Sequence, residues 1–274
     1  MGVLNVTPDS FSDGGRFIEP ALAVARALEM VAQGADAIDL GGESTRPGAA
    51  PVTVDEELRR VVPVIRALRE RTDVPLSIDT TRAAVADAAL REGACVLNDV
   101  GLGDPPEVLG AVAAARSAAY IAMHSGRRWE SVEARRSTRY TDVVTDVADG
   151  LRALRDRVVA AGVAPERVLL DPGVGFAKDA AASLELLANL STLRGLGHAL
   201  CVGASRKSFI VDATAYPRGW AADPSPPSER LGGTAAAVAL AVWQGAEILR
   251  VHDVGLMRQC ARVAHALSAA RRAP

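Results

Sequence analysis

Short apolar runs alternate with longer alanine-rich stretches along the whole of this 274-residue sequence. Each apolar run is followed by polar residues or glycine and then by a stretch with helical periodicity, so the alternation predicts repeated strand–helix units. The predicted strands are residues 2–6, 36–40, 75–78, 95–97, 119–123, 167–171, 199–203 and 247–251. The predicted helices are residues 19–33, 54–71, 83–92, 106–115, 142–161, 181–193, 231–244 and 257–270.

Eight strand–helix pairs over roughly 250 residues are typical of a (β/α)8 barrel. The strands are mostly continuous apolar runs, as expected when both faces of a parallel sheet are buried. An open doubly wound sheet is the alternative. Chemically reactive residues follow nearly every strand, which favours a ring of loops around one mouth, and no Gly-x-Gly-x-x-Gly follows the first strand. We therefore predict a single α/β domain over residues 1–274, with its active site at the carboxyl ends of the strands.

The composition is that of an ordinary globular protein, with 49% hydrophobic and 23% charged residues. The net charge of −2 gives no reason to expect nucleic acid or an anionic membrane as a partner. The sequence opens without a basic targeting region and holds no apolar run of membrane-spanning length. Cys95, Cys201 and Cys260 are far apart among small apolar residues, so we expect free thiols and a cytoplasmic protein.

Lysine is rare in this chain. Of the 31 basic residues only Lys178 and Lys207 are lysine, and both lie in loops that follow predicted strands. A compact ammonium on a flexible stem cannot be replaced by a planar guanidinium without a change of geometry. These two positions are therefore candidates for specific roles.

Polar residues stand at the end of nearly every predicted strand, and in a barrel they would converge on one face. Asp79, Asn98 and Asp171 would supply acceptors for a flat heterocycle with several N–H donors. Arg46, with Arg250 and His252, would form a cationic rim suited to phosphate or pyrophosphate. The complete set of strand-end candidates is Asn5, Ser44, Thr45, Arg46, Asp79, Asn98, His124, Asp171, Lys207, Arg250 and His252.

Each candidate also has a structural interpretation that the residues leave open. Asp171 can cap the following helix, His252 can be a helix-start histidine, and Arg250 can pair with Asp253. Asn5 with Asp9 and Asp13 suits Mg²⁺, which keeps waters and bridges phosphate oxygens. The two aspartates also fit as ordinary turn residues. The placement of so many candidates at successive strand ends favours the functional interpretation.

Segments in this order resemble the signatures of the dihydropteroate synthases, and the resemblance covers almost the whole chain. They are residues 2–15, 41–48 (GGESTRPG), 77–80 (SIDT), 98–100 (NDV), 123–124 (MH), 171–178 (DPGVGFAK), 203–209 (GASRKSF) and 250–254 (RVHDV). Two segments depart from the pattern, namely Gly101-Leu102-Gly103 and Ser125-Gly126.

The resemblance implies a transferase of folate biosynthesis. It would join 6-hydroxymethyl-7,8-dihydropterin pyrophosphate to p-aminobenzoate and release 7,8-dihydropteroate and pyrophosphate. It also implies Mg²⁺ as cofactor, a homodimer and the binding of sulfonamides. The alternatives are a non-catalytic pterin-binding paralogue and a methyltetrahydrofolate-dependent methyltransferase. The Ser-Thr-Arg-Pro-Gly and Ser-Arg-Lys loops argue against the methyltransferase, as does the lack of a corrinoid partner domain.

The resemblance also implies a role for individual positions. Pterin-binding positions are Asp79, Asn98, Met123, Asp171, Gly203 and Lys207. Pyrophosphate-binding positions are Asn5, Arg46, Arg250 and His252, with Asn5 as metal ligand. The p-aminobenzoate positions are Thr45, Arg46, Pro47, Phe176, Lys207 and Ser208. The catalytic set is Asp79, Asp171, Lys207, Arg250 and His252.

An aromatic amine is neutral near pH 7, so this reaction needs no strong general base. The difficult step is loss of pyrophosphate, and the cation left behind delocalises into the pterin ring. We therefore expect a dissociative, SN1-like displacement in which Asp171 binds the pterin and holds negative charge near the cation.

Overall fold

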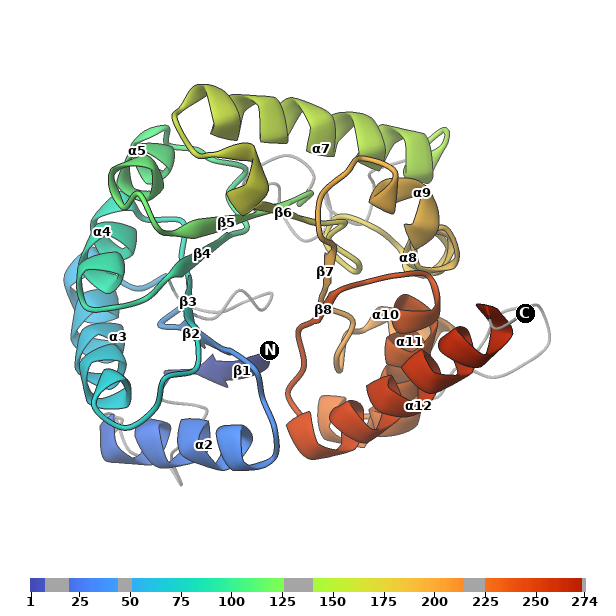
Figure 1. Cartoon of the computed structure of the whole chain (residues 1–274), viewed down its shortest axis with the longest axis horizontal. Helices are drawn as coiled ribbons and strands as arrows, with labels where there is room; N and C mark the ends of the chain where they lie inside the picture. The colour runs from blue at the N-terminus through green and yellow to red at the C-terminus, as the bar shows by residue number, and fades with distance from the viewer. Residues whose placement is uncertain (8–19, 44–50, 126–139, 214–224, 273–274) are drawn as a thin grey trace. The chain divides into compact units, whose positions relative to one another are not determined.

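The computed structural model describes residues 1–7, 20–43, 51–125, 140–213 and 225–272. Within these residues every predicted strand is present (Figure 1). The strands are β1 (Gly2–Asn5), β2 (Ile38–Gly41), β3 (Leu76–Asp79), β4 (Val96–Asp99), β5 (Ala119–Met123), β6 (Val168–Asp171), β7 (Cys201–Val202) and β8 (Ile248–Leu249). The helices between and after them are α2 (Pro20–Ala32), α3 (Val54–Arg69), α4 (Ala83–Arg91), α5 (Glu107–Ala114), α7 (Val143–Ala160), α8 (Ala180–Ala188), α9 (Leu190–Arg194), α10 (Phe209–Ala213), α11 (Leu231–Trp243) and α12 (Val254–Arg272).

Some element boundaries differ from the prediction. The helix predicted over residues 181–193 is divided at Asn189, whose side-chain amide donates to the carbonyl of Glu185 at 2.8 Å. Asparagine competes in this way with regular helical backbone bonding. Helix α12 begins at Val254, three residues earlier than predicted, and the short helix α10 was not predicted. Strands β7 and β8 have only two residues each.

The chain divides into two compact units. The first unit contains Met1–Met123 and Leu154–Leu169, and the second contains His124–Ala153 and Leu170–Pro274. In the first unit β1 to β5 pair in parallel and in sequence order, and β6 begins at the end of this sheet. Helices α2 to α5 lie along one side of these strands (Figure 1). In the second unit β7 and β8 pair in parallel.

Helix α3 shows why the helices of the first unit pack as they do. Its buried residues Val61, Val64, Ile65 and Leu68 follow the spacing of one helical face. Burying such a side chain contributes about 1.5–3 kcal/mol. The helix starts at Thr53, whose hydroxyl accepts from the backbone N–H of Glu56 at 3.2 Å. This N-cap satisfies one of the unpaired N–H groups at the helix start.

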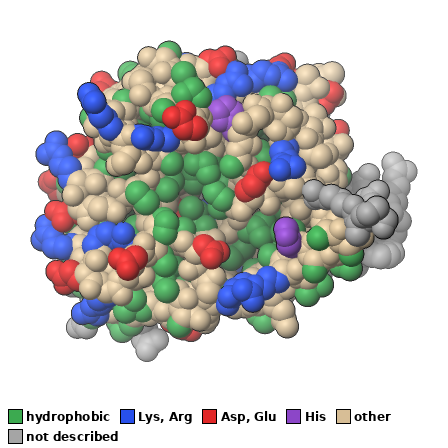
Figure 2. All heavy atoms as spheres, viewed as in Figure 1, with side chains coloured by type: hydrophobic (Ala, Val, Ile, Leu, Met, Phe, Trp, Pro, Cys, Tyr) green, Lys and Arg blue, Asp and Glu red, His purple; other side chains and the backbone are tan. Residues whose placement is uncertain are grey.

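Charged side chains of both signs are interspersed over the face of the molecule that Figure 2 shows. This distribution agrees with the small net charge of −2. Among the described helices, we find none with the length and apolar character needed to cross a membrane.

Candidate active site

In the first unit, the ends of four neighbouring strands bring three candidate residues into one row. Asn5 on β1 pairs in register with Gly41 on β2, Gly41 with Asp79 on β3, and Asp79 with Asn98 on β4. Register partners in a parallel sheet place their side chains on the same face. Gly41 contributes no side chain to this row. A Cβ at this position would lie 3.8 Å from the Oδ1 atom of Asn5 and also 3.8 Å from the Cβ atom of Asp79. Three of the strand-end candidates thus lie in one row, and two of them, Asp79 and Asn98, belong to the predicted acceptor set.

A further acidic residue orients one member of this row. Asp39 lies two residues before Gly41, is fully buried, and accepts from the Nδ2 atom of Asn98 at 3.0 Å. A carboxylate only accepts, so the amide nitrogen of Asn98 faces Asp39. The Oδ1 atom of Asn98 is then a buried acceptor with no hydrogen-bond partner among the described residues. Such an atom is costly unless a ligand pairs with it. Asp39 was not among the predicted site residues, although an acidic residue inside an apolar strand is an unusual feature of the sequence.

The segment Gly101-Leu102-Gly103, which departs from the signature pattern given above, forms a turn around the Asp99 carboxylate. The carboxylate of Asp99 accepts from the backbone N–H of Gly101 at 2.6 Å, that of Gly103 at 2.7 Å, and the Tyr120 hydroxyl at 2.6 Å. A Cβ at Gly101 would lie 2.8 Å from the Oδ1 atom of Asp99, which is too close. In this chain the turn is organised around Asp99, and glycine is needed at its first position.

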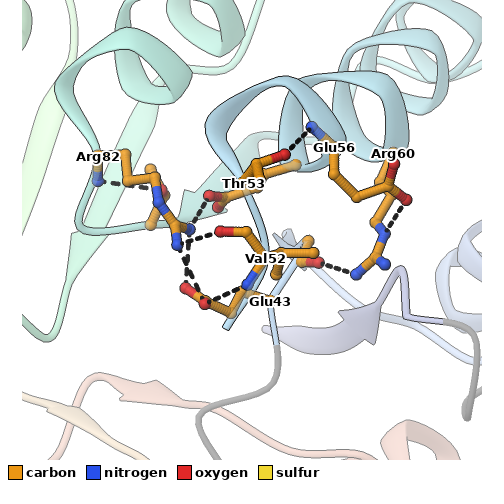
Figure 3. Close-up of polar contacts among 9 residues, drawn as sticks. Glu43, Val52, Thr53, Glu56, Arg60 and Arg82 are labelled. Atoms are coloured by element: carbon orange, nitrogen blue, oxygen red, sulfur yellow. Dashed lines mark hydrogen bonds and ion pairs between the residues drawn. The ribbon is translucent and has the colours of Figure 1, made fainter. Parts of the chain in front are cut away.

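Arg82 joins the two ends of the segment that carries Thr45, Arg46 and Pro47 (Figure 3). Its guanidinium donates to both carboxylate oxygens of Glu43, at 2.8 and 3.1 Å, and to the carbonyl of Val52 at 2.7 Å. It also forms an ion pair with Glu57, which is 1% exposed. The carboxylate of Glu43 accepts in turn from the backbone N–H of Val52 at 3.1 Å. Residues 43 and 52, which lie on either side of this segment, are therefore tied to each other and to the turn after β3.

In the second unit, Asp171 ends β6 and is 5% exposed. Its Oδ1 atom accepts from the backbone N–H of Gly173 at 2.7 Å. Burial raises the pKa of Asp171, while Lys207, the Gly173 N–H, Arg250 and Lys178 act in the opposite direction. The alternative role as a helix cap is wrong, because α8 is capped by Asp179, which accepts from the Ala182 N–H at 2.8 Å.

Lys207 contacts the loop that follows β6. Its ammonium donates to the carbonyl of Val174 at 2.5 Å and lies 4.3 Å from the centre of the Phe176 ring. Gly203 adjoins both cations of this unit, since a Cβ there would lie 3.8 Å from the Arg250 side chain and 3.9 Å from the Lys207 Nζ atom. The predicted pterin-binding positions of the second unit thus gather around Lys207.

His252 and Arg250 follow β8. The His252 Nδ1 atom lies 3.0 Å from the Ser205 hydroxyl, which ties this histidine to the loop after β7. Helix α12 begins two residues after His252. Asp253 pairs with Arg206, with the Nε–Oδ2 distance at 2.8 Å, so the alternative pairing of Asp253 with Arg250 is not the one observed.

The remaining predicted residues divide into those that the structure describes and those that it does not. Met123 is buried at the end of β5, and Ser208 is exposed just before α10. Asp9, Asp13, Ser44, Thr45, Arg46 and Pro47 lie outside the described residues. The described residues contain no group of three or more His, Cys, Asp or Glu side chains arranged to hold a metal ion. Mg²⁺ often takes only one or two protein ligands and completes its shell with water and phosphate oxygens, so the amide oxygen of Asn5 at the end of β1 fits such an ion.

Comparison with known proteins identifies the family. Residues 1–252 match the family described as pterin binding enzyme. The dihydropteroate synthase of Synechocystis sp. is 47% identical over 268 residues, which cover 97% of this chain and 89% of the relative.

Solved structures agree in fold as well as in sequence. The dihydropteroate synthase of Xanthomonas albilineans, determined with 4-aminobenzoic acid, has a TM-score of 0.87 and 41% identity, with 100% of this chain and 93% of that chain covered. The Yersinia pestis dihydropteroate synthase in complex with a sulfonamide drug has a TM-score of 0.88 and 41% identity, with 98% and 93% covered. The fold class is the (β/α)8 barrel that the strand–helix alternation predicts. Together with the strand-end residues described above, these likenesses establish that the chain belongs to the dihydropteroate synthases, a family of pterin-binding transferases.

Proposed function

We propose that this chain joins 6-hydroxymethyl-7,8-dihydropterin pyrophosphate to p-aminobenzoate, forming 7,8-dihydropteroate and pyrophosphate in folate biosynthesis. The main support is that Asn5, Asp79 and Asn98 lie in one row at the strand ends. The buried Oδ1 atom of Asn98 has no hydrogen-bond partner among the described residues, so it can accept from a ligand. Family membership supports the reaction, and the X. albilineans relative was determined with 4-aminobenzoic acid. An assay of pyrophosphate release tests the proposal. Release should require pterin pyrophosphate, Mg²⁺ and p-aminobenzoate together.

The pterin is held by acceptors and by one ammonium. Asp79, Asn98 and Asp171 accept from the N–H edge of the ring, and Lys207 donates to its carbonyl oxygen or ring nitrogen. Met123 and Gly203 supply apolar contact and space beside the ring. Burial is the largest influence on Asp171 and raises its pKa, while Lys207, the Gly173 N–H and Arg250 favour the charged form of the carboxyl. A negative charge at that position favours a developing cation on the pterin methylene.

We assign the binding of the leaving pyrophosphate to Arg250, His252 and Arg46, and we assign Asn5 as the metal ligand. Arg250 supplies a planar donor pair for phosphate oxygens. The contact with Ser205 fixes the His252 ring, so its other nitrogen has a defined direction. Asn5 would hold Mg²⁺, and that ion would supply positive charge for the leaving group.

The second substrate occupies the region of Phe176, Lys207 and Ser208, with Thr45, Arg46 and Pro47. The 4.3 Å contact between Lys207 and the Phe176 ring joins a cation and an apolar surface, a combination that suits an aromatic carboxylate. The Y. pestis relative is described in complex with a sulfonamide drug. We expect a sulfonamide to compete with p-aminobenzoate in this chain as well.

The displacement is dissociative, with pyrophosphate leaving before the amine attacks. Positional isotope exchange in the pyrophosphate group, measured without p-aminobenzoate, tests this order. Scrambling of the bridging oxygen supports a cationic intermediate. Normal turnover with no scrambling would favour a direct displacement.

The chain works as a single domain over residues 1–274 and acts in the cytoplasm. Cys95, Cys201 and Cys260 are free thiols, as expected in a reducing compartment. A non-catalytic pterin-binding paralogue remains the alternative function, because of the altered turn at Gly101–Gly103. Binding of the pterin without release of pyrophosphate would favour that alternative. Methyl transfer from methyltetrahydrofolate would favour the methyltransferase.

The chain forms a homodimer through an apolar groove on α11 and α12. Of the large hydrophobic side chains that are exposed among the described residues, five line this groove, and no charged residue lines it. They are Leu240, Trp243, Leu256, Val263 and Leu267. A face without charge can pack against its own copy across a two-fold axis. Sedimentation should show a dimer that Leu267→Glu converts to monomer. Leu22→Glu, at an exposed leucine on α2, is the control and should remain a dimer.

A further inference from the structure

Lys178, the other of the two lysines, is buried although no step of the proposed reaction uses it. Its side chain is 7% exposed. Its Nζ atom lies 3.0 Å from the carbonyl oxygen of His124, 3.1 Å from that of Gly173 and 3.0 Å from that of Phe176. The Nζ atom also lies 3.0 Å from the Nδ1 atom of His124, so three carbonyl oxygens and one ring nitrogen surround an amine that has at most three N–H donors. The Lys178 amine is therefore enclosed mainly by backbone oxygens, and its burial lowers its pKa to about 7.

These three carbonyls belong to two segments that Lys178 holds together. His124 follows β5, and Gly173 and Phe176 lie in the loop after β6. The loop approaches His124 closely, because a Cβ at Gly173 would overlap the His124 carbonyl oxygen. The loop also contains three left-handed residues, Gly173 (φ 65°), Gly175 (φ 77°) and Ala177 (φ 50°). Glycine adopts such φ values readily, whereas at Ala177 this backbone conformation is unfavourable and persists only where its surroundings fix it.

The same loop contacts Lys207 at two points. The carbonyl of Val174 accepts from the Lys207 ammonium at 2.5 Å, and the Phe176 ring lies 4.3 Å from it. Val174 and Phe176 lie between Gly173 and Ala177, whose conformations Lys178 helps to fix. A chain of contacts thus runs from one lysine to the other through the loop.

We infer that Lys178 is a positioning residue, whose ammonium holds the Gly173–Ala177 loop against His124 and thereby sets the place of Lys207. Lys178 acts through the loop and touches no substrate. The catalytic consequence rests on the proposed role of Lys207, whereas the structural consequence does not. The charged and titratable groups facing Lys178 are Asp171, Lys207, His124 and Tyr140.

The two-lysine composition makes this inference directly measurable. A protein labelled with ¹³C-lysine gives side-chain signals from Lys178 and Lys207 alone. In the ligand-free wild type, the ring of Phe176 should shift the Hε signal of Lys207 away from its ordinary position. Lys178→Met leaves Lys207 as the single lysine, and its signal should move toward the ordinary position. An unmoved Lys207 signal in folded Lys178→Met would overturn the inference.

A matched control and a second variant complete the test. Asp179→Ala removes the neighbouring helix cap but leaves the ammonium contacts intact, so the Lys207 signal should stay in place. Lys178→Gln retains two N–H donors and serves if the methionine variant does not fold. The expected kinetic result for either Lys178 variant is a rise of about tenfold in KM for p-aminobenzoate, with a fall in kcat.

The kinetic and spectroscopic results separate the inference from the proposed function. A shifted Lys207 signal with unchanged kcat and KM would overturn the link between Lys178 and catalysis. Absence of pyrophosphate release from the wild type would defeat the proposed function, and the ligand-free spectra would still decide whether Lys178 positions Lys207.

Discussion

Replacing Arg82 by Gln removes the group that joins residues 43 and 52, and the cost follows from the burial of its partners. Arg82 pairs with Glu43 and with Glu57, whose side chains are 22% and 1% exposed. Burial raises the pKa of Glu57, and bonds from Thr80 and Arg82 act against that effect. Without Arg82, the Glu57 carboxylate is left in the interior with its cation removed.

The magnitude is estimated by comparing two Arg–Glu pairs of the first unit. Removing one partner of a buried ion pair costs about 3–5 kcal/mol. Because the Arg82 side chain is 21% exposed, we expect a value near the lower end, about 3 kcal/mol. Arg66 makes a similar double contact with Glu92, at 3.0 and 2.6 Å, but these side chains are 63% and 30% exposed. Because solvent screens this pair, Arg66→Gln should cost clearly less than Arg82→Gln.

Urea unfolding of the two variants measures this difference, and Glu57→Gln added to Arg82→Gln should recover part of the loss. Steady-state kinetics provide a second readout. Because Arg82 ties together the ends of the segment with Thr45, Arg46 and Pro47, KM for p-aminobenzoate should rise more than KM for the pterin. The reasoning fails if Arg82→Gln destabilises the protein no more than Arg66→Gln does.

Three further predictions concern the site. Asp171→Asn should keep the fold and weaken pterin binding by about a hundredfold, measured by calorimetry, because an acceptor and a negative charge are both altered; near-normal affinity would contradict the assignment. Asp39→Asn should weaken pterin binding by about tenfold, since the new amide no longer fixes the orientation of Asn98; equal affinity would show that Asn98 is oriented by other contacts. Burial, with Lys178, lowers the pKa of His124 from 6.5 to about 3, so the unfolded state binds more protons between these values. Stability should therefore be full above pH 6.5 and fall by up to about 1.4 kcal/mol per pH unit toward pH 3; His124→Gln should flatten this slope in acid unfolding, and an unchanged slope would refute it.

The sequence predicted the strand ends well because local signals mark them. Asp79 and Asp171 each end an apolar run, and Pro172 and Gly173 stop the strand that Asp171 closes. The eightfold alternation predicted the fold class for the same reason. The break at Asn189 was missed because a side chain bonding back to the helix carries no periodic signal.

Residues that act through distant partners could not be predicted in this way. Arg82 meets Glu43 across 39 positions of the sequence, and Lys178 meets His124 across 54. Nothing in the flanking residues of either indicates such a partner. Asp39 is intermediate, because its position inside an apolar strand marks it as unusual, while its contact with Asn98 across 59 positions gives the reason.

The hydrogen bond between Asp39 and Asn98 also makes the row of Asn5, Asp79 and Asn98 selective among heterocyclic ligands. An amide that could rotate would accept from one ligand and donate to another. With its nitrogen held by Asp39, Asn98 offers only an oxygen, so a ring that presents an acceptor at this point meets repulsion and leaves both groups unpaired. Sites built in this way reject a mismatched analogue by as much as about 10⁴-fold. The buried carboxylate of Asp39 would thus restrict Asn98 to ligands that donate a hydrogen bond at this position.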